Sequence, residues 1–185
     1  MFPNYLTNFI NTTLLITLTA VTTPTRAQSF TATPAPEWSA LFDRTDGWTG
    51  ADGIYSIPLN GIETPPDTNR TTTLFVFSDT FVGQVDENDH RLPGTTLVNN
   101  TAALLKGTQP DPTKISFMVA RDKNGNPKAL VIPNTPNSKD GQWYWFEDGI
   151  ADGNQLRVFA LRMKPGDGGT FNFAVAGVSL ISADI

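Results

Sequence analysis

Two aspartates lie at the ends of two neighbouring apolar segments. Asp52 begins the strand predicted at residues 52–59, and Asp79 ends the strand predicted at residues 72–79. In an antiparallel hairpin the start of one strand lies beside the end of the next. Both carboxyl groups are therefore expected at the same end of one sheet. Two carboxylates this close repel each other, unless a group binds between them or one pKa shifts.

A second acidic pair, Glu147 and Asp148, follows the aromatic segment at residues 142–146. Hydrolysis of a glycosidic bond needs two carboxyl groups beside the scissile bond, one of them kept protonated by its surroundings. If the strands converge, we expect Asp52 to activate water and Glu147 or Asp148 to donate the proton. We expect Asp79 to tune this pair or to hold a substrate hydroxyl.

Each of these acids has a structural alternative. Asp–Gly is a common turn pair, and an aspartate at a strand end often caps a loop through its own backbone. The pairing of Asp52 with Asp79 favours function over that alternative. Aromatic side chains offer flat apolar faces to sugar rings, although tryptophans more often belong to a core. The candidates for substrate binding are Trp48, Tyr55, Asn100, Trp143, Tyr144 and Trp145.

Calcium binding is another use for clustered oxygen atoms. Residues 86–89 read Asp-Glu-Asn-Asp, but they lack the loop pattern and glycine of an EF-hand. A solvated acidic loop is the favoured interpretation. We therefore expect no cofactor, with calcium as the weaker alternative.

Composition excludes several kinds of site and partner. The 185 residues include no cysteine, which removes disulfides, thiolate nucleophiles and cysteine-based zinc sites. A Ser-His-Asp triad would have to use the single histidine, His90, which lies in a charged loop although the base of a triad is normally buried. A net charge of -5 without a basic cluster argues against nucleic acid and anionic membranes as partners. The expected partner is carbohydrate.

The elements that must position these residues are predicted to be strands. Short alternating apolar segments separated by residues typical of turns indicate an all-β domain. Besides the hairpin, strands are expected at residues 96–105, 115–120, 142–146, 156–163 and 171–181. Residues 82–95 are expected to form a long polar loop. One helical turn at residues 37–42 is expected to pack Trp38 and Phe42 onto the domain.

An approximate repeat indicates how the strands are arranged. The stretch from Trp48 to Gly53 resembles the stretch from Trp145 to Gly153. Recurring units with Asp–Gly turns and aromatic strands are typical of a β-propeller; a β-sandwich is the alternative. The chain holds about two blades, and propellers usually have about four to eight. We therefore expect residues 38–185 to be the N-terminal part of a propeller in a longer protein, or else a complete small sandwich.

The start of the chain predicts export. Residues 1–27 contain a short apolar core at residues 14–21, and Ala27 is a small residue suited to cleavage, although no Lys or Arg precedes the core. The alternative is a membrane anchor, but the core is shorter than the ~20 residues that span a bilayer. We expect a cleaved signal peptide, then a linker at residues 28–37. The mature protein is then secreted or periplasmic, without membrane contact.

Three segments carry a resemblance to a known family: residues 41–59, 74–83 and 98–101. Their most specific pieces are Gly-Ala-Asp-Gly at residues 50–53 and Phe-Ser-Asp-Thr-Phe at residues 77–81. Together they resemble the start of a bacterial family of secreted proteins of unknown function. These look like five-bladed propellers, related in fold to the glycosidases that cleave arabinans, xylosides and fructans.

In those glycosidases, acidic residues from successive blades line a central pocket. The resemblance implies Asp52 as the carboxylate of the first blade and a further acid near Glu147 or Asp148, whereas Asp79 has no secure counterpart. Two functions follow as expectations. One is a carbohydrate-active propeller that resembles the glycoside hydrolases, and the other is a non-catalytic propeller that binds a glycan or another partner.

Overall fold

The computed structural model describes residues 30–62, 72–107 and 109–185. The predicted signal peptide at residues 1–27 lies outside these residues. Ala35–Ile185 forms one compact unit, which is the unit described below. The all-β class is confirmed, because the only helix among the described residues is the single turn α1 (Pro36–Ser39). No helix in these ranges has both the length and the apolar composition needed to cross a bilayer.

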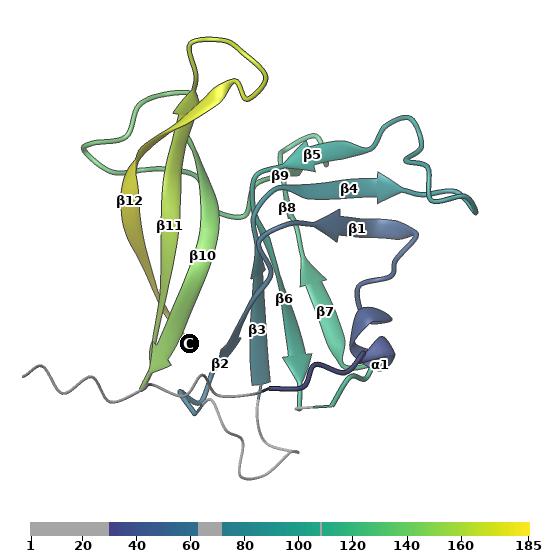
Figure 1. Ribbon diagram of the computed structural model, residues 1–185. Coiled ribbons are helices and arrows are strands. Elements are labelled where there is room, and N and C mark those ends of the chain that lie inside the picture. Colours follow the sequence, from purple (N-terminus) through teal and green to yellow (C-terminus); the bar gives the residue numbers. More distant parts are fainter. Residues whose placement is uncertain (1–29, 63–71, 108) are drawn as a thin grey trace, which may run out of the picture. The chain divides into compact units, whose positions relative to one another are not determined.

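Three long strands each break once and continue in a new direction. The pairs are β1 (Asp46–Ala51) with β2 (Tyr55–Pro58), β3 (Thr72–Phe77) with β4 (Thr80–Gln84), and β5 (Thr96–Val98) with β6 (Thr101–Lys106). One half of each pair joins the sheet β1-β4-β5, and the other half joins the sheet β2-β3-β6-β7, which β7 (Ile115–Met118) completes. Figure 1 shows the first sheet running across the direction of the second. The breaks, at residues 52–54, 78–79 and 99–100, form a common line that we call the bend.

Polar side chains hold the bend together. The buried polar residues of the described chain are Ser78, Thr80, Asn100 and Thr101. Thr80 Oγ1 lies 2.9 Å from Thr101 Oγ1, and Trp48 Nε1 donates to Thr101 Oγ1 over 3.2 Å. A break in a ladder leaves backbone groups that need partners when they are buried. This need explains why serine, threonine and asparagine occupy an interior that is otherwise apolar.

A further sheet contains β10 (Trp143–Asp152), β11 (Gln155–Pro165) and β12 (Phe173–Asp184), paired antiparallel in chain order. A small hairpin of β8 (Ala120–Arg121) and β9 (Pro127–Lys128) precedes it. β10 packs against β2 and β3. The shared core contains Ile57, Leu74, Val76, Ala102, Tyr144, Phe146, Val158 and Ala160. Burial of this apolar surface is the main force that joins the two sheets.

A second core lies on the other face of β3 and β6. It contains Leu41, Trp48, Phe75, Phe77, Ala103, Leu105 and Ile115, and Trp38 and Phe42 pack against it from the α1 segment. The predicted packing of Trp38 and Phe42 is thus confirmed. Strand β3 buries Leu74 and Val76 on one face and Phe75 and Phe77 on the other. Its unbroken apolar run is typical of a strand enclosed on both sides.

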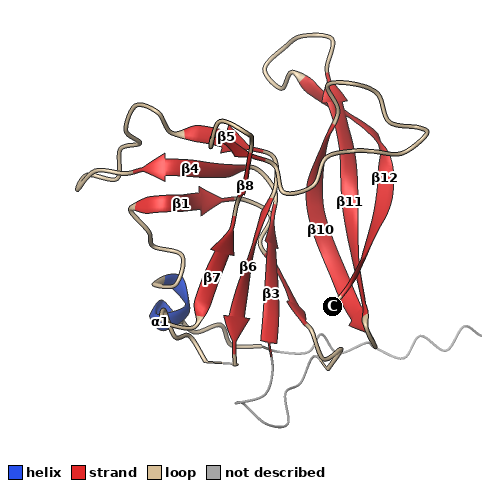
Figure 2. Ribbon diagram, turned by 180° about the vertical axis from the view of Figure 1, so that it is seen from behind, coloured by secondary structure: helices blue, strands red, loops and turns tan. Residues whose placement is uncertain are grey.

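Several predictions differ from the structure. The predicted loop at residues 82–95 begins inside β4, and the predicted strand at residues 96–105 is two strands separated by Asn99 and Asn100. The two parts of the approximate repeat occupy unlike places, since Gly53 lies in the bend and Gly153 in the hairpin turn between β10 and β11. Among the described strands no sheet closes on itself, as the reverse view in Figure 2 also shows.

Candidate functional site

The bend brings Asp52 and Asp79 together, as the hairpin predicts. Asp52 lies between β1 and β2, and Asp79 lies between β3 and β4. The Asp52 amide donates to the Asp79 carbonyl over 3.1 Å, and the Ser78 amide donates to the Asp52 carbonyl over 3.0 Å. These bonds continue the pairing across the break. Both carboxyl groups therefore belong to one rigid corner of the sheet.

The Asp79 side chain receives two hydrogen bonds on one oxygen. Trp145 Nε1 on β10 donates to Oδ1 over 2.7 Å, and Asn99 Nδ2 donates to the same oxygen over 3.1 Å. Asn99 comes from the third break of the bend, between β5 and β6. Hydrogen bonds to a charged acceptor are short and strong. Asp79 is thus oriented from two sides.

Glu147 reaches the same region from a β-bulge in β10. Two residues, Glu147 and Asp148, oppose the single residue Phe159 of β11, because the pairing shifts between Phe146 and Gly149. A bulge changes the direction of a side chain, and bulges are frequent beside active sites. The Phe146 carbonyl at the start of the bulge accepts a 2.8 Å hydrogen bond from Ser78 Oγ. The bulge is therefore attached directly to the bend.

Tyr55 holds the Glu147 carboxylate. Its hydroxyl donates to Glu147 Oε2 over 2.7 Å, which links the start of β2 to the bulge. This bond is the first cause of a raised pKa of the Tyr55 hydroxyl, followed by burial and by the negative charges of Glu147 and Asp148. A phenol that donates to a carboxylate gives up its proton less readily.

The pKa of the Asp52 carboxyl is raised above its ordinary value. Partial desolvation of this otherwise exposed side chain is the largest cause, and the negative charges of Asp79 and Glu147 add to it, against the opposing effect of backbone hydrogen bonds. Both neighbouring charges favour the neutral acid. The three carboxyl groups thus interact electrostatically, although their sequence positions are far apart.

A cavity of about 430 Å³ opens beside Asp52 and Asp79. Its walls are Gly50, Ala51, Asp52, Asp79, Phe81, Arg91 and Leu97. The Arg91 guanidinium carbon lies 3.5 Å from the centroid of the Phe81 ring. Sequence reasoning missed Arg91 and Asn99. Asn99 directly precedes the candidate Asn100, but only the bend shows which of the two faces the carboxylates.

The other predicted site residues lie in different surroundings. Trp48 is 3% exposed within the second core, and Asn100 is 0% exposed. Asn100 Nδ2 donates to the carbonyls of Val131 and Tyr144 over 2.9 and 3.0 Å, so this side chain fixes a loop to β10. Asp148 is exposed, and its Oδ1 accepts the Gly149 amide over 2.8 Å. The structure therefore brings together Asp52, Asp79, Glu147, Tyr55 and Trp145.

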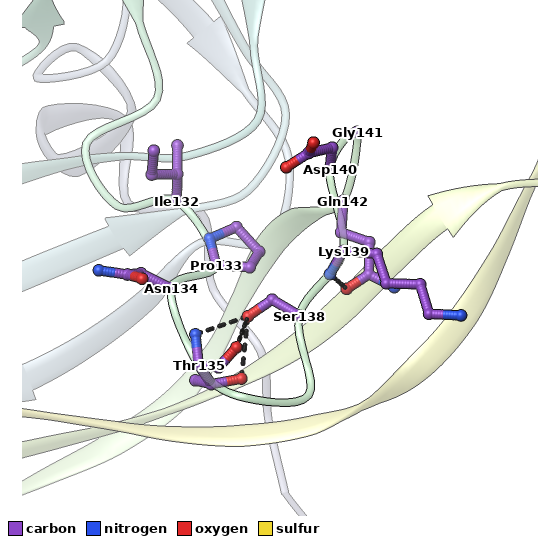
Figure 3. Close-up of a pocket in the computed structure, with 9 residues that line it drawn as sticks. All are labelled: Ile132, Pro133, Asn134, Thr135, Ser138, Lys139, Asp140, Gly141 and Gln142. Carbon is purple, nitrogen blue, oxygen red and sulfur yellow. Dashed lines mark hydrogen bonds between the residues drawn. The ribbon is translucent and has the colours of Figure 1, made fainter.

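A second cavity of about 300 Å³ belongs to the loop before β10, drawn in Figure 3. Hydrogen bonds within the loop fix its shape. The Thr135 amide donates to Ser138 Oγ over 2.6 Å, and the Lys139 amide donates to Gln142 Oε1 over 3.0 Å. Asp140 is the only acidic side chain in its lining. This cavity therefore lacks the converging carboxyl groups found at the bend.

The acidic loop at residues 86–89 uses its first aspartate as a turn residue. Asp86 Oδ1 accepts the amides of Asn88 and His90, each over 2.9 Å, and Asp86 pairs with His90 over 3.4 Å. The hydrogen bonds from His90 and Asn88 lower the pKa of the Asp86 carboxyl. Within the described ranges no three acidic or histidine side chains are grouped to hold a metal ion.

Comparison with known proteins places the chain in a family. Residues 36–185 match the family described as domain of unknown function, DUF5005. No curated protein matches the sequence. A solved structure of similar fold is a candidate hydrolase from Bacteroides ovatus ATCC 8483, with 18% identity and a TM-score of 0.61. The match covers 80% of this chain but only 38% of that protein, and the likeness is one of fold. On the match over residues 36–185, the chain belongs to the DUF5005 family.

Proposed function

We propose that this protein is a secreted carbohydrate-active hydrolase with Asp52, Asp79 and Glu147 as its catalytic carboxyl groups. The observation that carries the proposal is the convergence of these groups at the bend, where burial, and after it the charges of Asp79 and Glu147, raise the pKa of Asp52. Acid–base hydrolysis needs one carboxyl group that stays protonated and another that stays ionised. Electrostatic interaction between neighbouring carboxyl groups separates their protonation states in this way.

The proposal gives each group a role. Asp52 donates its proton to the glycosidic oxygen as the bond to the leaving sugar breaks. Glu147, oriented by Tyr55, accepts a proton from the water that attacks the anomeric carbon. This assignment reverses the roles that the sequence suggested for Asp52 and Glu147, because a raised pKa suits a proton donor.

Asp79 and Asp148 have lesser parts. Asp79, held by Trp145 and Asn99, stabilises positive charge on the sugar ring in the transition state or accepts a hydrogen bond from a substrate hydroxyl. Asp148 has no direct role in the proposal, because its carboxylate accepts a hydrogen bond from the adjacent Gly149 amide. Trp145, which donates a hydrogen bond to Asp79, is partly exposed and offers an aromatic face to a sugar.

The architecture we propose for this function is a β-propeller. The sheets β2-β3-β6-β7 and β10-β11-β12 each follow chain order and pack face to face, as neighbouring blades do. Asp52 lies in the break between β1 and β2, and Glu147 lies on β10, which packs against β2. One acid thus lies just before the first strand of its sheet and the other within the first strand of the next, and in a propeller the blades are arranged around a central channel.

Export completes the proposal and is supported by the apolar core at residues 14–21 and by Ala27. Expression in a bacterial host that exports proteins is expected to yield a mature chain starting at Gln28. N-terminal sequencing of the product from the periplasm or medium tests this. A full-length chain retained in the cytoplasm would contradict it.

The catalytic proposal is tested with the purified protein and a panel of plant and microbial glycans. We expect release of reducing sugar, and a loss of about a hundredfold or more in Asp52→Asn and Glu147→Gln. Asp46→Asn is the matched control, because Asp46 lies at the opposite end of β1 from the bend. Circular dichroism and thermal unfolding check that each variant folds.

Two outcomes would contradict hydrolysis. Equal activity in Asp52→Asn and in the unaltered protein would place the chemistry elsewhere. Binding of glycans without cleavage of any would instead support a non-catalytic glycan-binding domain.

A further inference from the structure

The cavity beside Asp52 and Asp79 contains one cation, Arg91. We propose that this cavity binds a sugar that carries a carboxylate, a uronate, and that Arg91 binds that carboxylate. This inference rests on the proposed function, because it names the substrate class of the same site. It makes Arg91 a specificity-determining residue and assigns it no part in bond breaking.

Arg91 is held in place by its own loop and by an aromatic ring. Its backbone pairs with Val85 in an isolated bridge, and the Leu92 amide donates to the Gln84 carbonyl over 2.9 Å. Its guanidinium lies on the face of Phe81, with 3.5 Å between the guanidinium carbon and the ring centroid. Stacking of this kind leaves the N–H groups at the edge of the guanidinium free to bind an anion.

No carboxylate of the described chain lies within ion-pair distance of Arg91. Asp52 and Asp79 line the same cavity, yet Asp79 Oδ1 accepts hydrogen bonds from Trp145 and Asn99, and backbone hydrogen bonds act on the Asp52 carboxyl. The guanidinium therefore has unused donors that face a cavity large enough for a small ligand.

The charges of the cavity favour one orientation of an acidic sugar. A uronate carboxylate placed beside Asp52 and Asp79 would meet the carboxylate of Asp79, whereas the Arg91 end offers a fork of donors that matches a carboxylate. Leu97, which is 49% exposed, and Phe81 provide an apolar wall for the sugar ring. With its carboxylate at Arg91, the sugar presents its glycosidic oxygen toward the two aspartates.

The test compares acidic sugars with their neutral parents. The purified chain is titrated at low salt with D-glucuronate and D-glucose, and with D-galacturonate and D-galactose, by calorimetry or NMR. We expect at least one uronate to bind about tenfold more tightly than its parent, which is the effect of one charge-assisted hydrogen bond of about 1.4 kcal/mol. Added salt should reduce this preference.

Variants show whether Arg91 is the cause. Arg91→Gln should abolish the preference for the uronate, and Arg91→Lys should keep part of it. Arg121→Gln is the matched control, because it removes the same charge from the exposed β8–β9 hairpin, where Arg121 donates to the Gly125 carbonyl. Arg91 is exposed, so folding should survive its replacement, as circular dichroism will check.

The outcomes separate this inference from the proposed function. No preference for either uronate, or a preference that Arg91→Gln leaves intact, overturns the inference. Cleavage of neutral glycans that requires Asp52 would support the proposed function while the inference fails. A uronate preference that depends on Arg91, without cleavage of any glycan, would support the binding site and contradict the hydrolase.

Discussion

Trp145 and Asp79 connect two sheets through one hydrogen bond. The indole Nε1 on β10 donates to Asp79 Oδ1 over 2.7 Å, across 66 positions of sequence. A hydrogen bond to a charged group contributes about 1.5–3 kcal/mol when buried, and this pair is only partly buried. We predict that Trp145→Phe lowers the free energy of unfolding by about 1–2 kcal/mol, measured by urea denaturation.

Trp143→Phe is the matched control for that loss. Trp143 lies two positions earlier on β10, and its Nε1 is buried without a hydrogen-bond partner. The substitution removes the same ring atoms but no hydrogen bond, so it should cost less than Trp145→Phe. Equal losses in the two variants would show that ring volume, and not the bond to Asp79, explains the effect.

The bond between Tyr55 and Glu147 should appear in a tyrosine titration. Glu147 is the main cause of the raised pKa of Tyr55. We predict that Glu147→Gln moves the ionisation of one tyrosine to lower pH, because the amide carries no charge to oppose the phenolate. Ultraviolet absorbance of tyrosinate measures this, with Asp140→Asn on a separate loop as control. Unchanged titration in Glu147→Gln would place Tyr55 and Glu147 apart in solution.

The placement of Asp52 beside Asp79 was predictable because a hairpin has simple geometry. The apolar runs at β2 and β3 define the strands, and antiparallel pairing fixes which ends meet. The all-β class follows in the same way from short alternating segments. These features depend only on short stretches of sequence and on strands that follow one another along the chain.

The bend and the bulge were not predictable from local pattern. Residues 96–105 read as one strand, because the break at Asn99 and Asn100 depends on partners supplied by Asp79, Val131 and Tyr144. Trp48 and Trp145 look alike in sequence, yet one is enclosed by the second core and the other faces Asp79. Tertiary contacts decide such cases.

The raised pKa of Asp52 has a consequence for stability. The unfolded chain loses this proton near the ordinary value of 3.8, but the folded chain keeps it to higher pH. The folded state thus binds more protons in that window, so this group's contribution to stability falls as pH rises through it. We predict that Asp52→Asn gains thermal stability relative to the unaltered protein as pH rises from below 3.8 to 7, measured by calorimetry.

Asp86→Asn removes the same charge as Asp52→Asn, but its effect on stability should depend on pH in the opposite direction. The pKa of Asp86 is lowered by hydrogen bonds from His90 and Asn88. Its stabilising contribution is complete above the ordinary value of 3.8 and is lost as pH falls through the lowered pKa. The variant should therefore be less stable than the unaltered protein at pH 7 and similar to it at low pH. Parallel pH profiles for the two variants would contradict at least one of the two assignments.

Gly149 sets the position of the bulge that carries Glu147. A Cβ there would overlap the Arg157 carbonyl oxygen and would lie 2.8 Å from Ile57 Cδ1 in the core between the sheets. Overpacking of this kind costs about 1–3 kcal/mol, and its relief requires the bulge that carries Glu147 to shift. We predict that Gly149→Ala lowers the free energy of unfolding by this amount in urea denaturation. It should also return the Tyr55 pKa toward its ordinary value.

In Gly153→Ala, the control, a Cβ meets no atom within 4 Å and only the positive φ of 60° opposes it. That control should cost about 1–2 kcal/mol and leave the Tyr55 titration unchanged. A tyrosine shift in Gly153→Ala but not in Gly149→Ala would show that the bulge does not position Glu147.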